Sequence, residues 1–137
     1  MPRTILLADD HEDNRLALLT VLAREGYHTL GAANGREAVE CALEHLPDLV
    51  LMDLAMPVMD GRQALRLIKE NPRTSHIPVV VLTAMALSVD RDRMVAEGFA
   101  ELLTKPCMPP LLIKTVHALI GPPELAESAE AAGPAED

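Results

Sequence analysis

Four apolar segments of this chain end in residues whose side chains can carry out chemistry. Asp9 and Asp10 follow the first segment, Asp53 ends the second, Thr83 ends the third and Lys105 follows the fourth. Three carboxylates that lie close together repel one another, and this repulsion costs stability. A divalent cation would reverse that cost, and carboxylate and carbonyl oxygens are the ligands that suit Mg²⁺. The pattern therefore favours an acidic metal site beside an ammonium group and a hydroxyl group, provided that the fold brings these residues together.

Short apolar runs alternate with segments of helical periodicity along the chain, and this alternation predicts five strand–helix pairs. The strands are expected at residues 4–8, 27–33, 48–52, 77–83 and 100–104. The helices are expected at residues 14–25, 35–46, 61–71, 89–97 and 109–120. Capping signals support these boundaries: Asn34 and Asp60 are each followed three residues later by Glu or Gln, Ser88 precedes the fourth helix, and Gly26 ends the first.

Strands that alternate with helices of 10 to 15 residues predict right-handed crossovers and a parallel sheet. The runs "ILLA", "LVLM" and "VVVL" are apolar at consecutive positions, which is typical of strands covered by helices on both faces. His28 and Thr29 place the second strand at an edge. We therefore predict an α/β fold, a doubly wound five-stranded parallel sheet of flavodoxin-like order 2-1-3-4-5. In such a sheet all carboxyl ends share one edge, where ligands bind between the first and third strands.

Length and composition fit one domain, which we expect at residues 1–120. Residues 121–137, "GPPELAESAEAAGPAED", hold five acidic residues and no basic residue. A segment with so few apolar side chains cannot offset the entropy of ordering itself. We therefore expect a flexible acidic tail rich in Ala, Glu and Pro, or a linker.

Charge and cysteine usage exclude several classes of protein. The net charge of −9 disfavours direct contact with nucleic acid, which requires a basic face. No apolar run approaches the roughly 18 to 20 residues that a membrane helix needs, so we expect no membrane insertion. Cys41 and Cys107 lack metal or redox spacing, which indicates reduced thiols in a cytoplasmic protein.

The segments around the chemical residues resemble a known family. Asp9-Asp10, "DLAMPVMDG" after the third strand, "LTA" after the fourth and "KP" after the fifth resemble the receiver domain of bacterial two-component response regulators. The resemblance covers roughly residues 3–120, and Asn14-Arg15 are also similar to the start of the first helix in many receivers. It implies that Asp53 is a phosphoacceptor and that Lys105 pairs with its carboxylate and then with the phosphoryl group.

The resemblance also implies a metal site. Asp10, Asp53 and the main-chain carbonyl of Ala55 would bind Mg²⁺ directly, with Mn²⁺ as a substitute, and Asp9 would act through a water or as a second ligand. Thr83 would hydrogen-bond a phosphoryl oxygen.

Several positions bear on the switch that the resemblance implies. Phosphorylation would draw Thr83 and the Ala84 amide toward the phosphoryl group, and the Lys105–Pro106 bond would be cis. Two positions depart from the family pattern. Leu102 replaces the usual Tyr or Phe, so a rotating aromatic switch is not implied, and Cys107, where Phe is frequent, is interpreted as a small apolar filler.

The lifetime of the phosphorylated state depends on two further positions. Ala55 and Met85 lie two residues after Asp53 and Thr83, where neither side chain can orient a water. They predict slow self-dephosphorylation.

The function that follows is signalling rather than enzymatic turnover on a substrate. The chain would receive a phosphoryl group from a sensor histidine kinase or a histidine phosphotransfer protein, and would act as a monomer or weak homodimer by binding a downstream protein. It would catalyse only its own Mg²⁺-dependent phosphorylation and dephosphorylation. A phosphorelay intermediate and a receiver excised from a larger hybrid protein are the alternatives.

More distant alternatives are weaker on residue grounds. A Mg²⁺-dependent phosphatase of the haloacid dehalogenase type also uses a nucleophilic Asp, but it needs a second acid where this chain has Ala55. A flavin or nucleotide binder needs a loop that cradles phosphate after the first strand, and Asp9 and Asp10 would repel one. A phosphorylation-independent scaffold would tolerate loss of the acids, which are all present. His11 is interpreted as a solvated loop residue rather than a metal ligand.

Overall fold

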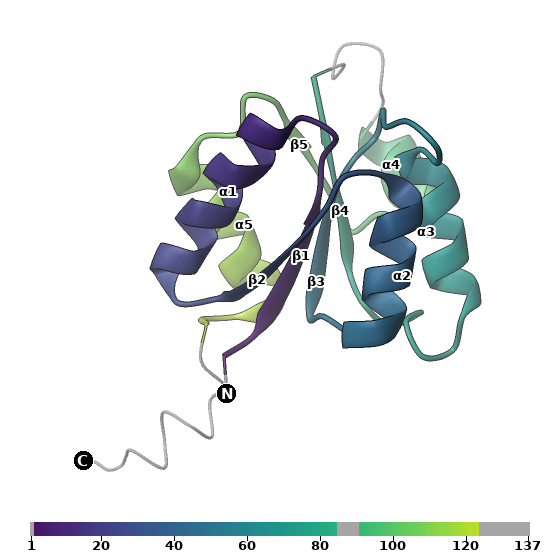
Figure 1. Cartoon of the computed structure of the whole chain (residues 1–137), viewed down its shortest axis with the longest axis horizontal. Helices are drawn as coiled ribbons and strands as arrows, with labels where there is room; N and C mark the ends of the chain where they lie inside the picture. Colours follow the sequence, from purple (N-terminus) through teal and green to yellow (C-terminus); the bar gives the residue numbers. More distant parts are fainter. Residues whose placement is uncertain (1, 85–90, 124–137) are drawn as a thin grey trace.

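Parallel strands form the centre of the molecule, and helices cover both faces of the sheet (Figure 1). The computed structural model describes residues 2–84 and 91–123. The strands are β1 (Thr4–Ala8), β2 (His28–Ala32), β3 (Leu49–Asp53), β4 (Val79–Thr83) and β5 (Glu101–Thr104). The helices are α1 (Glu12–Glu25), α2 (Gly35–His45), α3 (Gly61–Glu70), α4 (Arg91–Glu97) and α5 (Pro109–Ile120).

The strand order is β2-β1-β3-β4-β5 with every neighbouring pair parallel, so the predicted fold class and order are confirmed. The strand that contains His28 and Thr29 lies at an edge, as its polar residues indicate. The sheet reverses its direction of winding between β1 and β3. Ligands bind to folds of this kind outside the carboxyl ends of those strands.

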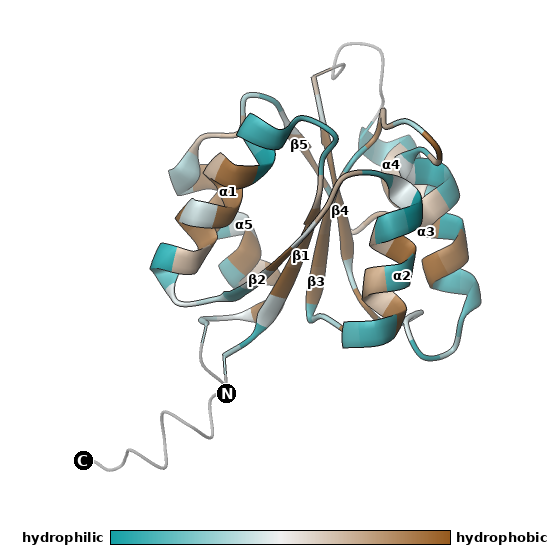
Figure 2. Cartoon of the chain, viewed as in Figure 1, coloured by the Kyte–Doolittle hydropathy of each residue, from teal (hydrophilic) through white to brown (hydrophobic). Residues whose placement is uncertain are grey.

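Two hydrophobic cores lie on opposite faces of the sheet. Side chains of α2, α3 and α4 pack with one set of strand residues, and side chains of α1 and α5 pack with the other set. Within β1, Leu6 faces the first core and Leu7 faces the second. The strands are mostly hydrophobic, whereas the helices carry both hydrophobic and hydrophilic residues (Figure 2). Burial on both faces is the reason that these strands read as continuous apolar runs.

The helix boundaries largely follow the predicted capping signals. Asp60 and Gln63 form a full capping box, with bonds of 2.9 and 3.0 Å, and Asn34 accepts the Glu37 N–H at 2.9 Å. Gly26 ends α1 with φ of 109°. The structure starts α1 at Glu12, two residues before the predicted position, where acidic side chains suit the positive end of the helix dipole. The predicted cap at residue 88 lies outside the described residues.

The strands are shorter than predicted where a proline or a turn intervenes. β4 starts at Val79 instead of residue 77, because Pro78 has no N–H for the ladder and the Ile77 N–H bonds to the Thr74 carbonyl in a turn. Phe99, the single phenylalanine of the chain, is 2% exposed and packs in the core with α2, α3 and α4.

Contacts with the domain continue past residue 120. The Tyr27 hydroxyl donates to the Gly121 carbonyl at 2.7 Å, and the backbone N–H of Arg3 donates to the Pro123 carbonyl at 2.6 Å. Arg3 Nε also donates to the Pro122 carbonyl at 3.2 Å. The first three residues of the predicted tail are therefore bound to the domain, and residues 124–137 lie outside the described part of the chain.

Tyr27 offers a spectroscopic test of this arrangement, because the chain has one tyrosine and no tryptophan. Burial, assisted by the charge of Glu25, raises the pKa of Tyr27 to about 12. A raised pKa stabilises the fold below the unfolded pKa of about 10, and this contribution is lost as the pH rises through the folded pKa. We expect tyrosinate absorbance to develop at a clearly higher pH in the folded protein than in urea.

The Tyr27→Phe variant is the control for this titration. It should lose less stability than the wild type between about pH 10 and pH 12, since only the wild type must ionise a buried phenol. Identical titrations of the folded and urea-unfolded wild type would contradict the assignment.

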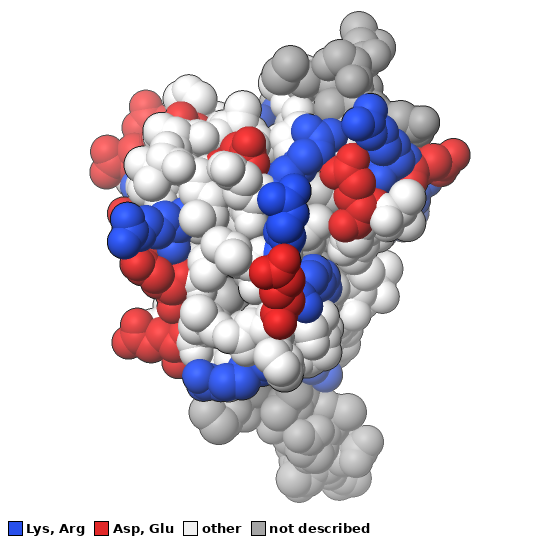
Figure 3. Space-filling view, turned by 90° about the vertical axis from the view of Figure 1, so that its right-hand side faces the viewer, with Lys and Arg blue, Asp and Glu red and all other residues white. Residues whose placement is uncertain are grey.

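The face formed by α3 and α4 carries basic side chains interspersed with acidic ones (Figure 3). Glu97 on α4 joins the two helices, because it pairs with Arg62 at 2.8 Å and with Arg93 at 3.2 Å. Such exposed pairs contribute little to stability. Among the residues that the structure describes, the helices are too short or too polar to cross a lipid bilayer.

Candidate functional site

The register of the sheet brings the predicted chemical residues to one edge. Ala8 on β1 pairs with Met52 on β3, so the residues that follow them, Asp9 and Asp53, emerge next to each other. On the other side of β3, Asp53 pairs with Leu82 on β4. Thr83 in turn pairs with Thr104, the last residue of β5. Lys105, which follows Thr104, therefore lies at the same edge.

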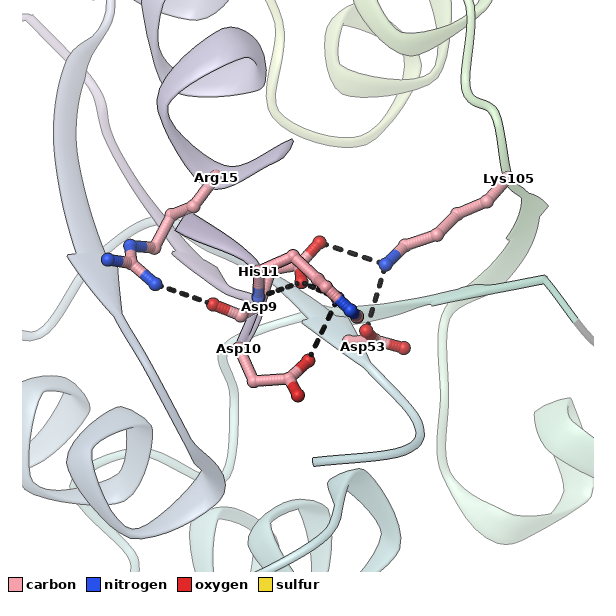
Figure 4. Close-up of polar contacts among 6 residues, drawn as sticks. All are labelled: Asp9, Asp10, His11, Arg15, Asp53 and Lys105. Atoms are coloured by element: carbon pink, nitrogen blue, oxygen red, sulfur yellow. Dashed lines mark hydrogen bonds and ion pairs between the residues drawn. The ribbon is translucent and has the colours of Figure 1, made fainter. Parts of the chain in front are cut away.

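Lys105 bridges two of the carboxylates at this edge (Figure 4). Its Nζ lies 2.8 Å from Asp53 Oδ2 and 2.9 Å from Asp9 Oδ2. The side chain of Asp9 is fully buried, and those of Asp53 and Lys105 are 9% and 15% exposed. Lys105 is therefore the cation that the sequence around Asp53 lacks, and it lies 52 positions away in the sequence.

Two opposing effects act on the charge of Lys105. Burial disfavours the ammonium form, but hydrogen bonds to Asp53 and Asp9 and the charges of these carboxylates favour it. The bonds outweigh burial, so the pKa of Lys105 is raised above its usual value. Lys105 is consequently a fixed positive charge at neutral pH.

Asp9 is held in place by one residue just before α1 and one residue in its first turn. Its Oδ1 accepts the backbone N–H of His11 at 2.9 Å, while Arg15 donates to its main-chain carbonyl at 2.8 Å. With Oδ2 bound to Lys105, both carboxylate oxygens of Asp9 are engaged. Asp9 therefore positions Lys105 and is less available as a direct ligand of an added cation.

Asp10, in contrast to Asp9, has a carboxylate oxygen that is not engaged in a hydrogen bond within the described part of the chain. Its Oδ1 is buried and makes no hydrogen bond with any residue that the structure describes, although His11 Nδ1 lies 3.3 Å away. A buried carboxylate oxygen without a hydrogen bond is unfavourable by about 1–3 kcal/mol or more. A cation placed here would remove that cost.

The donor set fits a hard divalent cation. One ligand atom each from Asp9, Asp10, His11 and Asp53 lies within 4.8 Å of the others. Opposite oxygens around Mg²⁺ are about 4.2 Å apart, twice the usual metal–oxygen distance, so small side-chain movements suffice. Carboxylates that keep several waters are the ligands that Mg²⁺ uses in proteins.

A cavity of about 560 Å³ opens beside these residues. Asp53, Thr83 and Lys105 line it together with residues of α1 and of the loops at the same edge of the sheet. The other lining residues are His11, Asn14, Ala17, Leu18, Ala55, Ala84, Pro106 and Cys107. The Asp53 carboxylate therefore faces a space that a reacting group can enter.

Comparison with known protein families identifies the family to which a chain with this site belongs. Residues 5–117 match the model of the response regulator receiver domain. The chain belongs to the response regulator receiver family. The polar-differentiation response regulator DivK of Brucella anthropi is 33% identical over 121 residues, which cover 88% of this chain and 98% of that protein.

Solved structures of receiver domains agree with this membership. A putative response regulator from Chloroflexus aurantiacus superposes with a TM-score of 0.82 at 29% identity, covering 88% of this chain and 98% of that one. The receiver domain of a sensor histidine kinase from Pseudomonas aeruginosa has a TM-score of 0.81 at 32% identity, covering 88% and 99%. That protein holds a magnesium ion in its active-site cleft. The chain thus belongs to a class of signalling modules.

The receiver domain gathers most of the residues that the sequence singles out. Asp9, Asp53 and Lys105 are in direct contact, and Ala55, Thr83 and Ala84 line the same cavity. The Lys105–Pro106 peptide bond is cis. Leu102 packs against the core under α2, α3 and α4. Met85 lies outside the residues that the structure describes.

Two residues of this receiver domain have site contacts that the sequence did not reveal. Arg15 lies one helical turn past the start of α1 and reaches back to the Asp9 carbonyl. His11, interpreted from the sequence as a solvated loop residue, lies among the potential ligand atoms. Its position directly after two acids was the one signal available.

Proposed function

We propose that this receiver domain accepts a phosphoryl group on Asp53 from a phosphohistidine of a sensor histidine kinase or a histidine phosphotransfer protein. One observation carries the proposal: Asp53 Oδ2 lies 2.8 Å from Lys105 Nζ, beside a buried oxygen of Asp10 that lacks a hydrogen bond to the described residues. A carboxylate with a fixed ammonium on one side and a ligand atom for a cation on the other is suited to receive a negatively charged group.

The reaction is an in-line displacement at phosphorus. An oxygen of Asp53 attacks, the bond from phosphorus to the donor imidazole nitrogen breaks, and Asp53 becomes a mixed anhydride. Positioning and charge neutralisation supply most of the catalysis in such transfers. Lys105, steadied by Asp9, would bind the phosphoryl oxygens. Mg²⁺, or Mn²⁺ in its place, would be held by Asp10, Asp53 and the Ala55 carbonyl and would neutralise charge on the phosphoryl group.

Groups at the end of β4 and in the loop after it would then bind the phosphoryl group. It adds about 1.5 to 2 negative charges and three acceptor oxygens. The Thr83 hydroxyl and the Ala84 amide would bind those oxygens and shift the population of the face formed by α4, β5 and α5. Each tenfold shift requires about 1.4 kcal/mol of differential binding. With Leu102 in place of an aromatic residue, the coupling would run through an aliphatic rotamer change or be weak.

The partners follow from this chemistry. The donor is a phosphohistidine protein, the output is a protein contact, and the protein acts in the cytoplasm as a monomer or weak homodimer without direct nucleic-acid binding. A phosphorelay intermediate is the alternative, since it uses the same site and passes the group on to a second histidine. Receiver domains of sensor kinases are also similar to this chain, so a role inside a larger hybrid protein is a further alternative.

The test is phosphoryl incorporation. Wild-type protein is incubated with Mg²⁺ and either acetyl phosphate or radiolabelled phosphorylated kinases, and intact mass and label are measured. The wild type should gain one acid-stable, base-labile phosphoryl group. The Asp53→Asn variant should gain none, while Asp48→Asn, at the opposite end of the same strand, should behave like the wild type. Label on both variants alike would refute the assignment of Asp53.

The phosphorylated state should decay slowly. Ala55 lines the cavity and its methyl group cannot orient an attacking water, and Met85 has no group suited to that task either. We expect the Met85→Glu variant, which can orient a water, to lose phosphate faster than the wild type. Phosphate release after loading with acetyl phosphate measures both rates. A wild-type half-life of seconds, or equal rates for the two proteins, would contradict the expectation.

A further inference from the structure

His11 lies beside the acidic cluster and has no role in the phosphoryl transfer described above. It occupies the position before α1 with extended backbone angles, φ of −91° and ψ of 110°, and its side chain makes no capping bond to the helix. Its backbone N–H donates to Asp9 Oδ1 at 2.9 Å. This turn holds the imidazole toward the carboxylates (Figure 4).

The imidazole is within reach of a shared ion. His11 Nδ1 lies 3.3 Å from Asp10 Oδ1 and 3.5 Å from Asp9 Oδ1. The side chain is 70% exposed, so the ring can turn toward an ion without losing core packing. Around a six-coordinate ion, adjacent ligands about 2.1 Å from the metal are about 3.0 Å apart, so these separations are close to those of neighbouring ligands.

Other contacts leave His11 and Asp10 as the available pair. Lys105 binds one oxygen each of Asp9 and Asp53, and the His11 N–H binds the other oxygen of Asp9. Asp10 Oδ1 has no hydrogen bond among the described residues. An ion that enters the cluster would therefore meet the Asp10 oxygen and the imidazole nitrogen with little competition from bonds within the protein.

An imidazole nitrogen changes the metal preference of a carboxylate site. Mg²⁺ prefers oxygen ligands, whereas imidazole suits later transition metals such as Co²⁺, Ni²⁺ and Zn²⁺. We propose that His11 is a ligand for divalent transition-metal ions beside Asp10 and Asp53, and that it makes the site bind them more tightly than Mg²⁺. The inference rests on the proposed Mg²⁺ site, and it implies that the two kinds of ion compete for one place.

Calorimetric titration of the full chain with Co²⁺ and with Mg²⁺ tests the proposal. The variants are His11→Gln and, as a matched control, His76→Gln, which alters an exposed histidine in the turn before β4. His11→Gln should weaken Co²⁺ binding by about tenfold or more, the scale seen for groups that tune metal sites, and should change Mg²⁺ binding by less than about twofold. His76→Gln should leave both affinities unchanged. Thermal melts verify that each variant is folded.

A second readout locates the nitrogen. Co²⁺ is paramagnetic, so the ring protons of His11 should shift strongly in the proton spectrum of the Co²⁺ complex and those of His76 should not. An unshifted His11 ring, or an unchanged Co²⁺ to Mg²⁺ affinity ratio in His11→Gln, would overturn the inference. Mg²⁺ binding that survives Asp10→Asn would instead refute the proposed Mg²⁺ site. The failures of the two proposals are thus distinguishable.

Discussion

Replacing Lys105 with methionine should lower the free energy of unfolding by about 3 kcal/mol, because it leaves the two carboxylates beneath it without a cation. Asp9 is fully buried and Asp53 nearly so, and both accept a hydrogen bond from the same ammonium group at 2.8–2.9 Å. Methionine keeps the length and most of the packing of the lysine stem. Denaturant unfolding in EDTA measures the loss, and added Mg²⁺ should restore part of it.

The same substitution should slow phosphorylation by acetyl phosphate about a hundredfold, the scale expected for one fixed charge at a developing anion. Two variants separate charge from packing. Lys114→Met, on the exposed face of α5, should have little effect on stability or rate. Adding Asp53→Asn to Lys105→Met should recover stability, since it removes one of the repelling carboxylates. If the double variant is no more stable than Lys105→Met, the loss arises from packing and not from charge.

Replacing Gly61 with alanine should lower both stability and the rate of phosphorylation, because the new side chain would displace the backbone next to Asp53. A Cβ at this first residue of α3 would lie 2.6 Å from the Asp53 carbonyl oxygen and 3.1 Å from Leu54 Cα. Both are backbone atoms, which cannot rotate aside, and the Gly61 N–H also donates to the Leu54 carbonyl at 2.9 Å. The loop after β3 must move, so we expect a loss of about 3 kcal/mol, at the upper end for overpacking.

Phosphorylation of Gly61→Ala should also slow, by up to about a hundredfold, because a displacement of about 1 Å at a reacting group has that effect. Gly31→Ala is the matched control. There the added methyl group would meet only side-chain atoms, Leu19 Cδ1 at 3.1 Å and Arg15 Cδ at 3.4 Å, which can move. Stability and the rate of phosphoryl incorporation are measured for both variants. Equal effects of the two substitutions would show that the close approach to Asp53 is unimportant.

The sequence alone determined the elements and their order in the sheet. The apolar runs and the capping pair Asp60–Gln63 are local signals, and a strand or a helix cap depends mainly on residues a few positions away. The alternation of strands and helices then restricts the topology, because right-handed crossovers allow few arrangements. For the same reason the sequence predicted that Asp9, Asp53 and Lys105 lie at the same edge of the sheet, at the carboxyl ends of their strands.

Element boundaries were predicted less well where tertiary contacts decide them. Gly121 and Pro123 belong to a segment that reads as a polar tail, yet they are bound by Tyr27 and Arg3. The partners lie about a hundred positions away in the sequence, and no local pattern reveals such a bond. The start of β4 at Val79 depends in turn on the path of the preceding turn.

Only the tertiary structure decided how the site residues are engaged. Lys105 lies 96 positions from Asp9 and 52 from Asp53, and sheet register brings all three within hydrogen-bond distance. That geometry engages both oxygens of Asp9, leaves an oxygen of Asp10 without a hydrogen bond to the described residues, and turns His11 toward the acids. The residue types determine which side chains could bind an ion. Burial and strand register determine which of these side chains are not already engaged in hydrogen bonds, because hydrogen bonds between distant segments form only once the chain has folded.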